Sequence, residues 1–216
     1  MTTGIIVGAA PLSDERQQLI ELLNNNHHYV IAADGGIKFF LDENIMPDKW
    51  IGDMDSSGNE IGRIVNDVFP DIITKSCSPI KDDTDMALAV EEMSSMNIRK
   101  ILIFGGLGGK RIEHSLANIQ MMHHYKMQGI DITMISDESR MMCLQNETAE
   151  FDRKQEGFVS VFSLTDEADV EIKGLYYEYN GILSNSHPLG VSNEFKCTNS
   201  YIKVNEGVVL IVLTKK

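Results

Sequence analysis

Short apolar runs separated by helical patterns are the feature that most constrains the fold of this chain. The runs at 5–9, 29–33 and 100–104 consist mainly of Ile, Val, Ala and Leu, a composition typical of strands buried on both faces of a sheet. Helical periodicity fills the intervals, at residues 13–25 (with Ser13 as the expected N-cap), 57–68, 84–96 and 113–127. Because buried strands alternate with helices, we expect an α/β fold with a mostly parallel sheet and helices on both faces.

The pattern changes after about residue 137. Apolar and polar residues then alternate with period two in several segments, at 158–163, 170–173, 201–204 and 208–213. This alternation, punctuated by glycines, predicts a small C-terminal antiparallel β-sandwich. We place a linker near residues 137–150 and divide the chain into domains 1–140 and 141–216.

Composition narrows the class of protein. With 43% hydrophobic residues among 216, the chain can bury a core, whereas its net charge of −13 argues against a nucleic-acid partner, which calls for a basic patch. No apolar run approaches the roughly 18 residues that span a bilayer, and the first residues lack the basic segment of a signal peptide. Cys77, Cys143 and Cys197 form neither a metal-binding pattern nor an evident disulfide framework, so we expect a cytoplasmic protein.

Polar, glycine-containing segments follow three of the predicted strands directly, at 34–36, 52–56 and 105–111. In open α/β sheets, ligands bind outside the carboxyl ends of the strands. We therefore expect these segments to converge on one crevice.

Two acidic clusters suit a hard cation. Asp53 and Asp55 belong to the first, Gly52–Ser56, and the second is Lys81–Asp85. Mg²⁺ takes oxygen ligands, usually one or two carboxylates plus substrate phosphate. The alternative is that these side chains cap helices or complement their dipoles. The carboxylates exceed that need, however, and repel one another unless a cation neutralises them.

The segment Gly105–Arg111 has the character of a phosphate-binding loop, because glycines let backbone N–H groups approach an anion and a helix follows. It matches neither the Walker A pattern nor G-x-G-x-x-G, since Arg111 occupies the last position of both. A strand-to-helix turn is the alternative. His114 lies beside Arg111, one helical turn before Asn118, and is a candidate functional residue, although a lone histidine is more often packed or at the surface. The polar segment 190–194 suggests a hairpin turn.

Together these segments resemble the thiamine pyrophosphokinase family. The resemblance rests on an ordered set: Ala33–Gly36, Gly52–Ser56, Lys81–Asp85, Gly109–His114 with Leu116–Asn118, and Ser192–Glu194. That family joins an α/β nucleotide domain to a C-terminal β-sandwich, which agrees with the two patterns above. The resemblance thus implies that residues 1–140 form the nucleotide-binding catalytic domain and residues 141–216 the thiamine-binding domain.

The resemblance implies an enzyme, a thiamine diphosphokinase. Such an enzyme transfers an intact diphosphate from ATP to the hydroxyethyl oxygen of thiamine, yields thiamine diphosphate and AMP, and requires Mg²⁺. It also implies a homodimer whose active sites combine residues of two subunits.

The resemblance assigns roles residue by residue. Asp53, Asp55 and Asp85 would hold the metal, and Arg111 and His114 complete the predicted catalytic set. Charge neutralisation and positioning would supply most of the catalysis. His114 or a carboxylate would accept the proton of the thiamine alcohol, unless that proton passes to solvent.

A larger set would hold ATP and its phosphates: Asp34, Gly35, Gly36, Lys81, Thr84, Gly108, Gly109, Lys110, Arg111 and Glu113. Ser192 and Asn193 would contact thiamine, whose cationic ring favours an aromatic wall. The aromatic candidates are Trp50, Tyr176, Tyr177 and Phe195.

Two residues depart from the family pattern: Glu113 stands where Asp is usual, and Lys110 replaces a common glycine. Two other functions therefore stay open. One is a pyrophosphokinase of another alcohol, such as a hydroxymethylpterin. The other is a non-catalytic nucleotide- or thiamine-binding module, and Glu113 is the feature that favours it.

Overall fold

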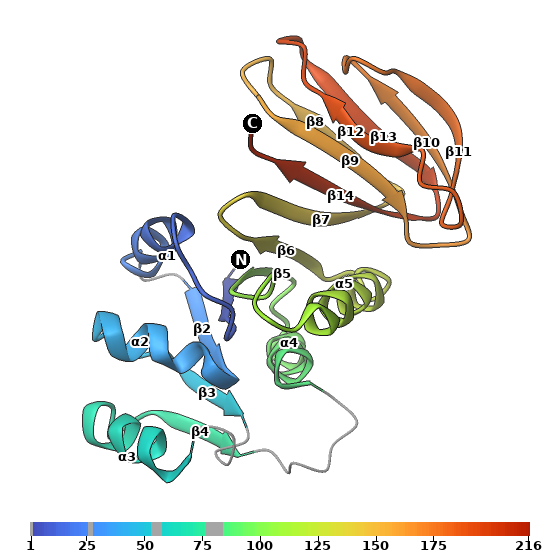
Figure 1. Ribbon diagram of the computed structural model, residues 1–216. Helices are drawn as coiled ribbons and strands as arrows, with labels where there is room; N and C mark the ends of the chain where they lie inside the picture. Colours follow the sequence, from blue (N-terminus) through green and yellow to red (C-terminus); the bar gives the residue numbers. More distant parts are fainter. Residues whose placement is uncertain (1, 26–27, 53–57, 77–83) are drawn as a thin grey trace. The chain divides into compact units, whose positions relative to one another are not determined.

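A computed structural model of the chain describes residues 2–25, 28–52, 58–76 and 84–216 (Figure 1). Its internal contacts divide the chain into two compact units. The first comprises residues 1–121 and 134–137, and the second comprises residues 122–133 and 138–216. Helix α5 (Ile112–Lys126) and strand β6 (Asp131–Ile135) fall across this division. The domain boundary between residues 140 and 141 stays a prediction.

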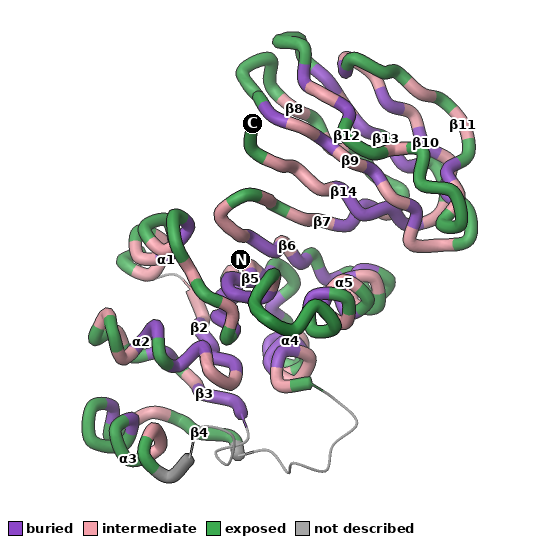
Figure 2. The backbone as a smooth tube through the Cα atoms, viewed as in Figure 1, coloured by how far each residue is buried: buried purple, intermediate pink, exposed green. Residues whose placement is uncertain are grey.

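The first unit contains a parallel sheet with strand order β5-β1-β2-β3-β4. Its strands are β1 (Thr3–Val7), β2 (His28–Ala33), β3 (Lys49–Gly52), β4 (Ile73–Ser76) and β5 (Lys100–Phe104). Between them lie α1 (Glu15–Leu23), a 3-10 turn at Asp34–Gly36, α2 (Ile37–Glu43), α3 (Gly58–Val68) and α4 (Asp85–Ser95). Strands β1 and β2 are buried over most of their length (Figure 2). This arrangement confirms the predicted α/β class.

Helices cover both faces of this sheet. Ile5 and Val7 point to one face, where they share a core with Leu19 of α1 and Phe40 of α2. Gly4 points to the other face, since a Cβ there would lie 2.2 Å from the sulfur of Met93 in α4. Successive side chains of a strand alternate between faces, so the unbroken apolar run of β1 serves both layers.

The second unit is a sandwich of two antiparallel sheets. One has the order β12-β9-β14-β7 and the other β11-β10-β13-β8. The strands are β7 (Ser139–Gln145), β8 (Thr148–Phe151), β9 (Phe158–Ser163), β10 (Glu167–Lys173), β11 (Tyr179–Ser184), β12 (Gly190–Glu194), β13 (Ser200–Glu206) and β14 (Val208–Thr214). Inward side chains from both sheets, including Val161, Val170 and Val209, form one buried core. The predicted C-terminal β-sandwich is therefore confirmed.

The structure corrects several local predictions. The expected linker at 137–150 is occupied by β7 and most of β8, because β7 pairs with β14 and β8 with β13, strands that lie far off in the sequence. The expected hairpin turn at 190–194 is strand β12. Asp14, rather than Ser13, precedes α1 as its N-cap residue, and no side-chain hydrogen bond caps the helix. Helix α2 has no counterpart in the sequence analysis.

No helix in the described part of the chain is both long enough and apolar enough to cross a membrane.

Glu92 ties α4 to two strands of the sheet. Lys49 of β3 donates a hydrogen bond to Oε1 of Glu92, and the Nζ of Lys75 in β4 lies 3.1 Å from Oε2. The bond from Lys49 is the main cause that holds the pKa of Glu92 below its ordinary value, and Lys75 acts in the same direction against partial burial. These ion pairs fix the position of the helix that begins at Asp85.

We predict that Glu92→Gln lowers the free energy of unfolding at neutral pH. Because the folded pKa of Glu92 lies below the unfolded value of about 4.3, its ion pairs stabilise the fold above that pH. This contribution is lost as the pH falls through the folded pKa. Urea unfolding from pH 7 to pH 3 should show the variant and the wild type converging in acid. Glu91→Gln, at the exposed neighbouring position, is the control, and a pH-independent difference for Glu92→Gln would contradict the prediction.

Gly36 is required for steric reasons. Its φ of −60° suits any residue, but a Cβ would lie 1.9 Å from the carbonyl oxygen of Val7. We predict that Gly36→Ala destabilises the protein by about 1–3 kcal/mol, the usual cost of overpacking. Gly62→Ala is the matched control, because nothing lies within 4 Å of a Cβ there. In helix α3 it should stabilise by roughly 0.5–1 kcal/mol. Equal effects in chemical denaturation would refute the steric argument.

Candidate functional site

A cavity of about 560 Å³ lies in the first unit, at the carboxyl ends of β1, β2 and β5. It is lined by the loops that follow these strands and by the first turns of α4 and α5. The lining residues are Gly8, Ala9, Ala10, Pro11, Ala33, Asp34, Thr84, Asp85, Met86, Gly105, Gly106, Gly108, Gly109, Lys110, Arg111, His114 and Asn118. Its volume falls within the range of small-molecule sites. The edge of the sheet is where the sequence pattern predicts a crevice.

The loops after β1 and β5 lie in direct backbone contact. The Gly8 N–H donates to the Phe104 carbonyl at 2.8 Å, and the Ala10 N–H donates to the Gly105 carbonyl at 3.1 Å. Gly105 has a φ of +64°, and a Cβ there would lie 2.6 Å from the Gly8 oxygen. Glycine is therefore needed at Gly105 for both conformation and space. The loop from Gly8 to Pro11 was not predicted as part of the site, although its small residues directly after a strand are a signal in the sequence.

Asp34 follows β2 directly and lines the cavity. Its backbone has a φ of +47°. Its carbonyl oxygen accepts a hydrogen bond from the indole Nε1 of Trp50 at 3.1 Å. Gly52 permits this approach, since a Cβ there would lie 3.2 Å from the Asp34 Cα. Trp50 is only 3% exposed, so its ring supports the loop rather than forming a wall for a ligand.

Two buried side chains of α5 hold the glycine loop in place. The Asn118 Nδ2 donates to the Gly106 carbonyl at 2.7 Å, and the Ser115 Oγ accepts from the Gly108 N–H at 3.0 Å. Both side chains belong to buried residues. The Gly108 N–H is thus bonded to Ser115, whereas the sequence predicts that backbone N–H groups of this loop bind phosphate. Ser115 itself was missed, because a serine within a helix gives no sequence signal.

Lys110, Arg111, Glu113 and His114 are exposed residues near the start of α5. The Arg111 Nε lies 2.7 Å from Oε1 of Glu113. This hydrogen bond is the main cause that lowers the pKa of Glu113 below its ordinary value. Glu113 is absent from the cavity lining, whereas Lys110, Arg111 and His114 belong to it.

Thr84 and Asp85 bring the start of α4 to the cavity. The Thr84 Oγ1 caps the helix by accepting from the Ala87 N–H at 3.2 Å. Asp85 occupies the first turn, is half-buried and lines the cavity. A carboxylate in this position suits a hard cation that also binds phosphate oxygens.

The other predicted metal ligands, Asp53 and Asp55, lie outside the described residues, as does Lys81. Among the residues that the structure describes, no three or more His, Cys, Asp or Glu side chains form a metal-binding group. The predicted set of Asp53, Asp55 and Asp85 therefore stays a prediction.

Four further predicted residues are not among those that line this cavity: Gly35, Gly36, Ser192 and Asn193. Gly35 and Gly36 form the 3-10 turn after β2, and Gly36 is buried against β1. Ser192 and Asn193 belong to β12 in the second unit.

Two family models match the chain in succession. The model of the thiamin pyrophosphokinase catalytic domain matches residues 20–134, which is more than half of the chain. The model of the thiamin pyrophosphokinase vitamin B1 binding domain matches residues 148–209. Most of the cavity-lining residues fall within the first match, and most of the sandwich falls within the second.

Individual proteins agree with these matches. Thiamine pyrophosphokinase of Bacillus subtilis is 23% identical over 185 residues, which cover 84% of this chain and 85% of that protein.

Solved structures share the fold. The crystal structure of the Bacillus subtilis thiamine pyrophosphokinase aligns with a TM-score of 0.86 at 22% identity, covering 100% of both chains. That of Geobacillus thermodenitrificans gives 0.84 at 22% identity, covering 100% of this chain and 98% of the other. The yeast enzyme gives 0.78 at 14% identity, covering 99% and 86%.

We predict that Asn118→Ala destabilises the protein by about 1–3 kcal/mol, because it leaves the buried Gly106 carbonyl without its partner. Leu116→Ala, on the exposed side of the same helix, should change stability by no more than about 0.5 kcal/mol. Thermal and urea unfolding of the two variants provide the measurement. A neutral Asn118→Ala would show that Asn118 does not support the loop.

Proposed function

The chain belongs to the thiamin pyrophosphokinase family, a family of enzymes, and we propose that it transfers the diphosphate group of ATP to the hydroxyl of thiamine. The products would be thiamine diphosphate and AMP, and the reaction would require Mg²⁺. The observation that carries this proposal is the cavity at the carboxyl ends of β1, β2 and β5, which combines a glycine loop with both carboxylate and basic side chains.

The glycine loop supports the placement of the ATP phosphates. It runs from β5 to the start of α5, so the N-terminus of a fifteen-residue helix follows it and favours a bound anion. Gly108 and Gly109 have φ values of +80° and +78°, which let the backbone approach a ligand closely. Lys110 and Arg111 follow on the same loop and would neutralise phosphate charge, with Lys81 as a further candidate.

Asp85 supports the placement of a divalent ion, together with Asp53 and Asp55 from the sequence pattern. Mg²⁺ bound there would supply charge neutralisation on the phosphate oxygens. Asp34 lines the cavity from the turn after β2 and would contact the nucleotide with Gly35, Gly36 and Thr84.

The thiamine alcohol must lose a proton as it attacks the β-phosphorus of ATP while AMP leaves. His114 is exposed and lines the cavity, which makes it the leading proton acceptor. A carboxylate of the cavity is the alternative. General base catalysis of this kind contributes typically ~10²–10⁴-fold.

Thiamine recognition would involve the second unit, which matches the vitamin B1 binding model. Among the aromatic candidates, Phe195 is 7% exposed, whereas Tyr176 and Tyr177 are 61% and 76% exposed. The two tyrosines are therefore the rings that can meet the cationic thiazolium, and Ser192 is an exposed residue on the adjacent strand. A homodimer with active sites composed of two subunits, in the cytoplasm, completes the proposal.

The test is incubation with thiamine, ATP and Mg²⁺, with the nucleotide products resolved. We predict AMP in amounts that match thiamine diphosphate, and no AMP when thiamine is omitted or Mg²⁺ is removed with a chelator. ADP as the product would contradict the proposal. AMP formation with a hydroxymethylpterin in place of thiamine would favour the alternative pyrophosphokinase, and binding without turnover would favour a non-catalytic module.

Asp85→Asn should lower turnover by at least roughly 100-fold while the fold persists, since loss of even an outer-sphere partner of a metal costs 10–100-fold. Glu60→Gln is the matched control, because it removes a first-turn carboxylate from another helix, α3, outside the cavity lining. If the two variants retain equal activity, the role assigned to Asp85 is wrong. Asp53→Asn and Asp55→Asn test the other two ligands in the same way.

A further inference from the structure

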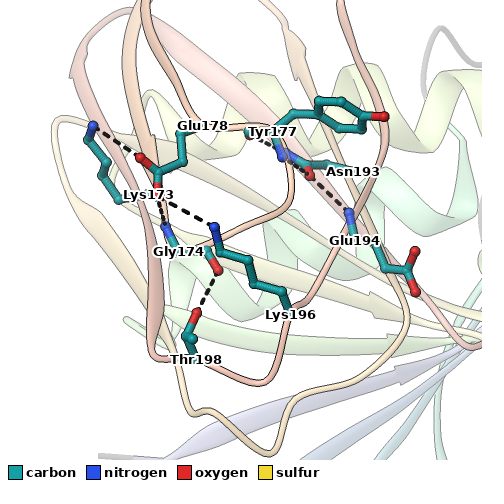
Figure 3. A network of polar contacts seen from close by, with 8 residues as sticks. All are labelled: Lys173, Gly174, Tyr177, Glu178, Asn193, Glu194, Lys196 and Thr198. Atoms are coloured by element: carbon teal, nitrogen blue, oxygen red, sulfur yellow. Dashed lines mark hydrogen bonds and ion pairs between the residues drawn. The ribbon is translucent and has the colours of Figure 1, made fainter.

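The turn between β10 and β11, residues 174–178, is held at both ends by polar contacts (Figure 3). At its start, the Gly174 N–H donates to Oε1 of Glu178 at 3.1 Å and the Thr198 hydroxyl donates to the Gly174 carbonyl at 2.9 Å. Lys173 donates to Oε2 of Glu178 at 3.3 Å. The Gly174 N–H and then Lys173 lower the pKa of Glu178 below its ordinary value. The turn is thus closed on itself by the side chain of its last residue.

Asn193 of β12 holds the middle of the same turn from the other sheet of the sandwich. Its Oδ1 accepts from the Tyr177 N–H at 3.0 Å and from the Glu194 N–H at 2.9 Å. Its Nδ2 donates to the Tyr177 carbonyl at 2.7 Å. Figure 3 shows the Asn193 amide alongside the Tyr177 backbone. Both functional groups of the amide are therefore engaged by protein, and the residue is only 9% exposed.

A β-bulge explains why Asn193 points inward. Gly190 pairs with Val161 and Asn193 with Val159, so β12 has one residue more than β9 over this interval. Ser192 takes up the irregularity with a φ of +57°, and its N–H donates to the Ser160 hydroxyl at 3.0 Å. Bulges of this kind re-aim a side chain. Here the bulge leaves Ser192 exposed and turns Asn193 toward the turn.

The result is a pair of exposed rings on a fixed backbone. The Tyr176 N–H donates to the Glu194 carbonyl at 3.0 Å, next to the two Asn193 bonds at Tyr177. The Tyr177 ring extends away from the Lys173–Glu178 contacts (Figure 3). A backbone ordered in advance lowers the entropic cost of binding a ligand.

We propose that Asn193 is a positioning residue, which acts on thiamine through the Tyr176–Tyr177 turn and makes no contact with thiamine itself. This inference rests on the proposed function and corrects the role that the family resemblance assigns to Asn193. Three of the four hydrogen bonds that an asparagine amide can make go to the backbone of Tyr177 and Glu194, and the residue is only 9% exposed, so the side chain is held to the protein rather than presented to a ligand. Ser192 and the tyrosine rings remain the groups of this region that meet the ligand.

A double-mutant cycle tests the proposal. We expect Asn193→Ala to raise the KM for thiamine by about 2- to 30-fold, the range that loss of a cation–π contact produces, and to leave the KM for ATP unchanged. In a Tyr177→Ala background the same change should have little further effect, because the group through which Asn193 acts is gone. Asn180→Ala, at an exposed asparagine of β11, is the matched control and should leave both constants unchanged.

Asn193→Asp keeps the volume of the side chain and should change the KM for thiamine in opposite directions for a direct contact and for a positioning role. A carboxylate in direct contact with cationic thiamine would lower the KM, whereas a carboxylate facing the Tyr177 carbonyl should raise it. Amide hydrogen exchange provides a readout that needs no substrate. Exchange at the Tyr177 N–H should accelerate in Asn193→Ala while β10 and β13 keep their protection.

Additive effects in the cycle, a lowered KM in Asn193→Asp, or unchanged exchange at Tyr177 would each overturn the proposal while leaving the proposed function intact. The proposed function is tested separately, by AMP release from the wild-type protein. Wild-type protein that releases no AMP from ATP and thiamine overturns the proposed function, and the inference about Asn193 falls with it.

Discussion

Backbone contact between the loops after β1 and β5 is the constraint on which the cavity depends. The Gly8 and Ala10 N–H groups donate to the Phe104 and Gly105 carbonyls, and this spacing leaves no room for a Cβ on Gly105. Gly36 likewise has no room for a Cβ, because the turn after β2 lies against the backbone at the end of β1. Because three strand ends meet at backbone distance, the side chains that follow them line one cavity rather than separate surfaces.

Polar side chains of helix α5, of the α4 N-cap and of strand β3 then hold the loops that follow the strands. Asn118 and Ser115 bind the backbone of the glycine loop, Thr84 caps α4, and Trp50 supports the Asp34 carbonyl. These residues use their polar groups on protein rather than on ligand. Lys110, Arg111 and His114 are exposed in the same lining, so their side chains can reach a ligand in the cavity.

The sequence predicted the first unit better than the second. Buried parallel strands such as β1 and β5 appear as unbroken apolar runs, so their positions follow from local composition. Strands β7 and β8 contain Arg, Gln and Glu among apolar residues, and their identity depends on pairing with distant strands. Asn193 is the clearest case in the candidate sites: its partner Tyr177 lies sixteen positions away, in the turn between β10 and β11. No sequence pattern indicates the bulge at Ser192 that turns Asn193 inward, so the bonds between its amide and the Tyr177 backbone could not be predicted from the sequence.

The central claim is that the cavity at the ends of β1, β2 and β5 holds a metal-bound nucleotide. The most direct test is a crystal structure of the protein with a non-hydrolysable ATP analogue and Mn²⁺, in which anomalous scattering locates the metal. The account predicts phosphate oxygens against residues 108–111 and a Mn²⁺ ion bound by Asp85 together with Asp53 and Asp55. A nucleotide bound elsewhere, or a metal with no contact to Asp85, would contradict it.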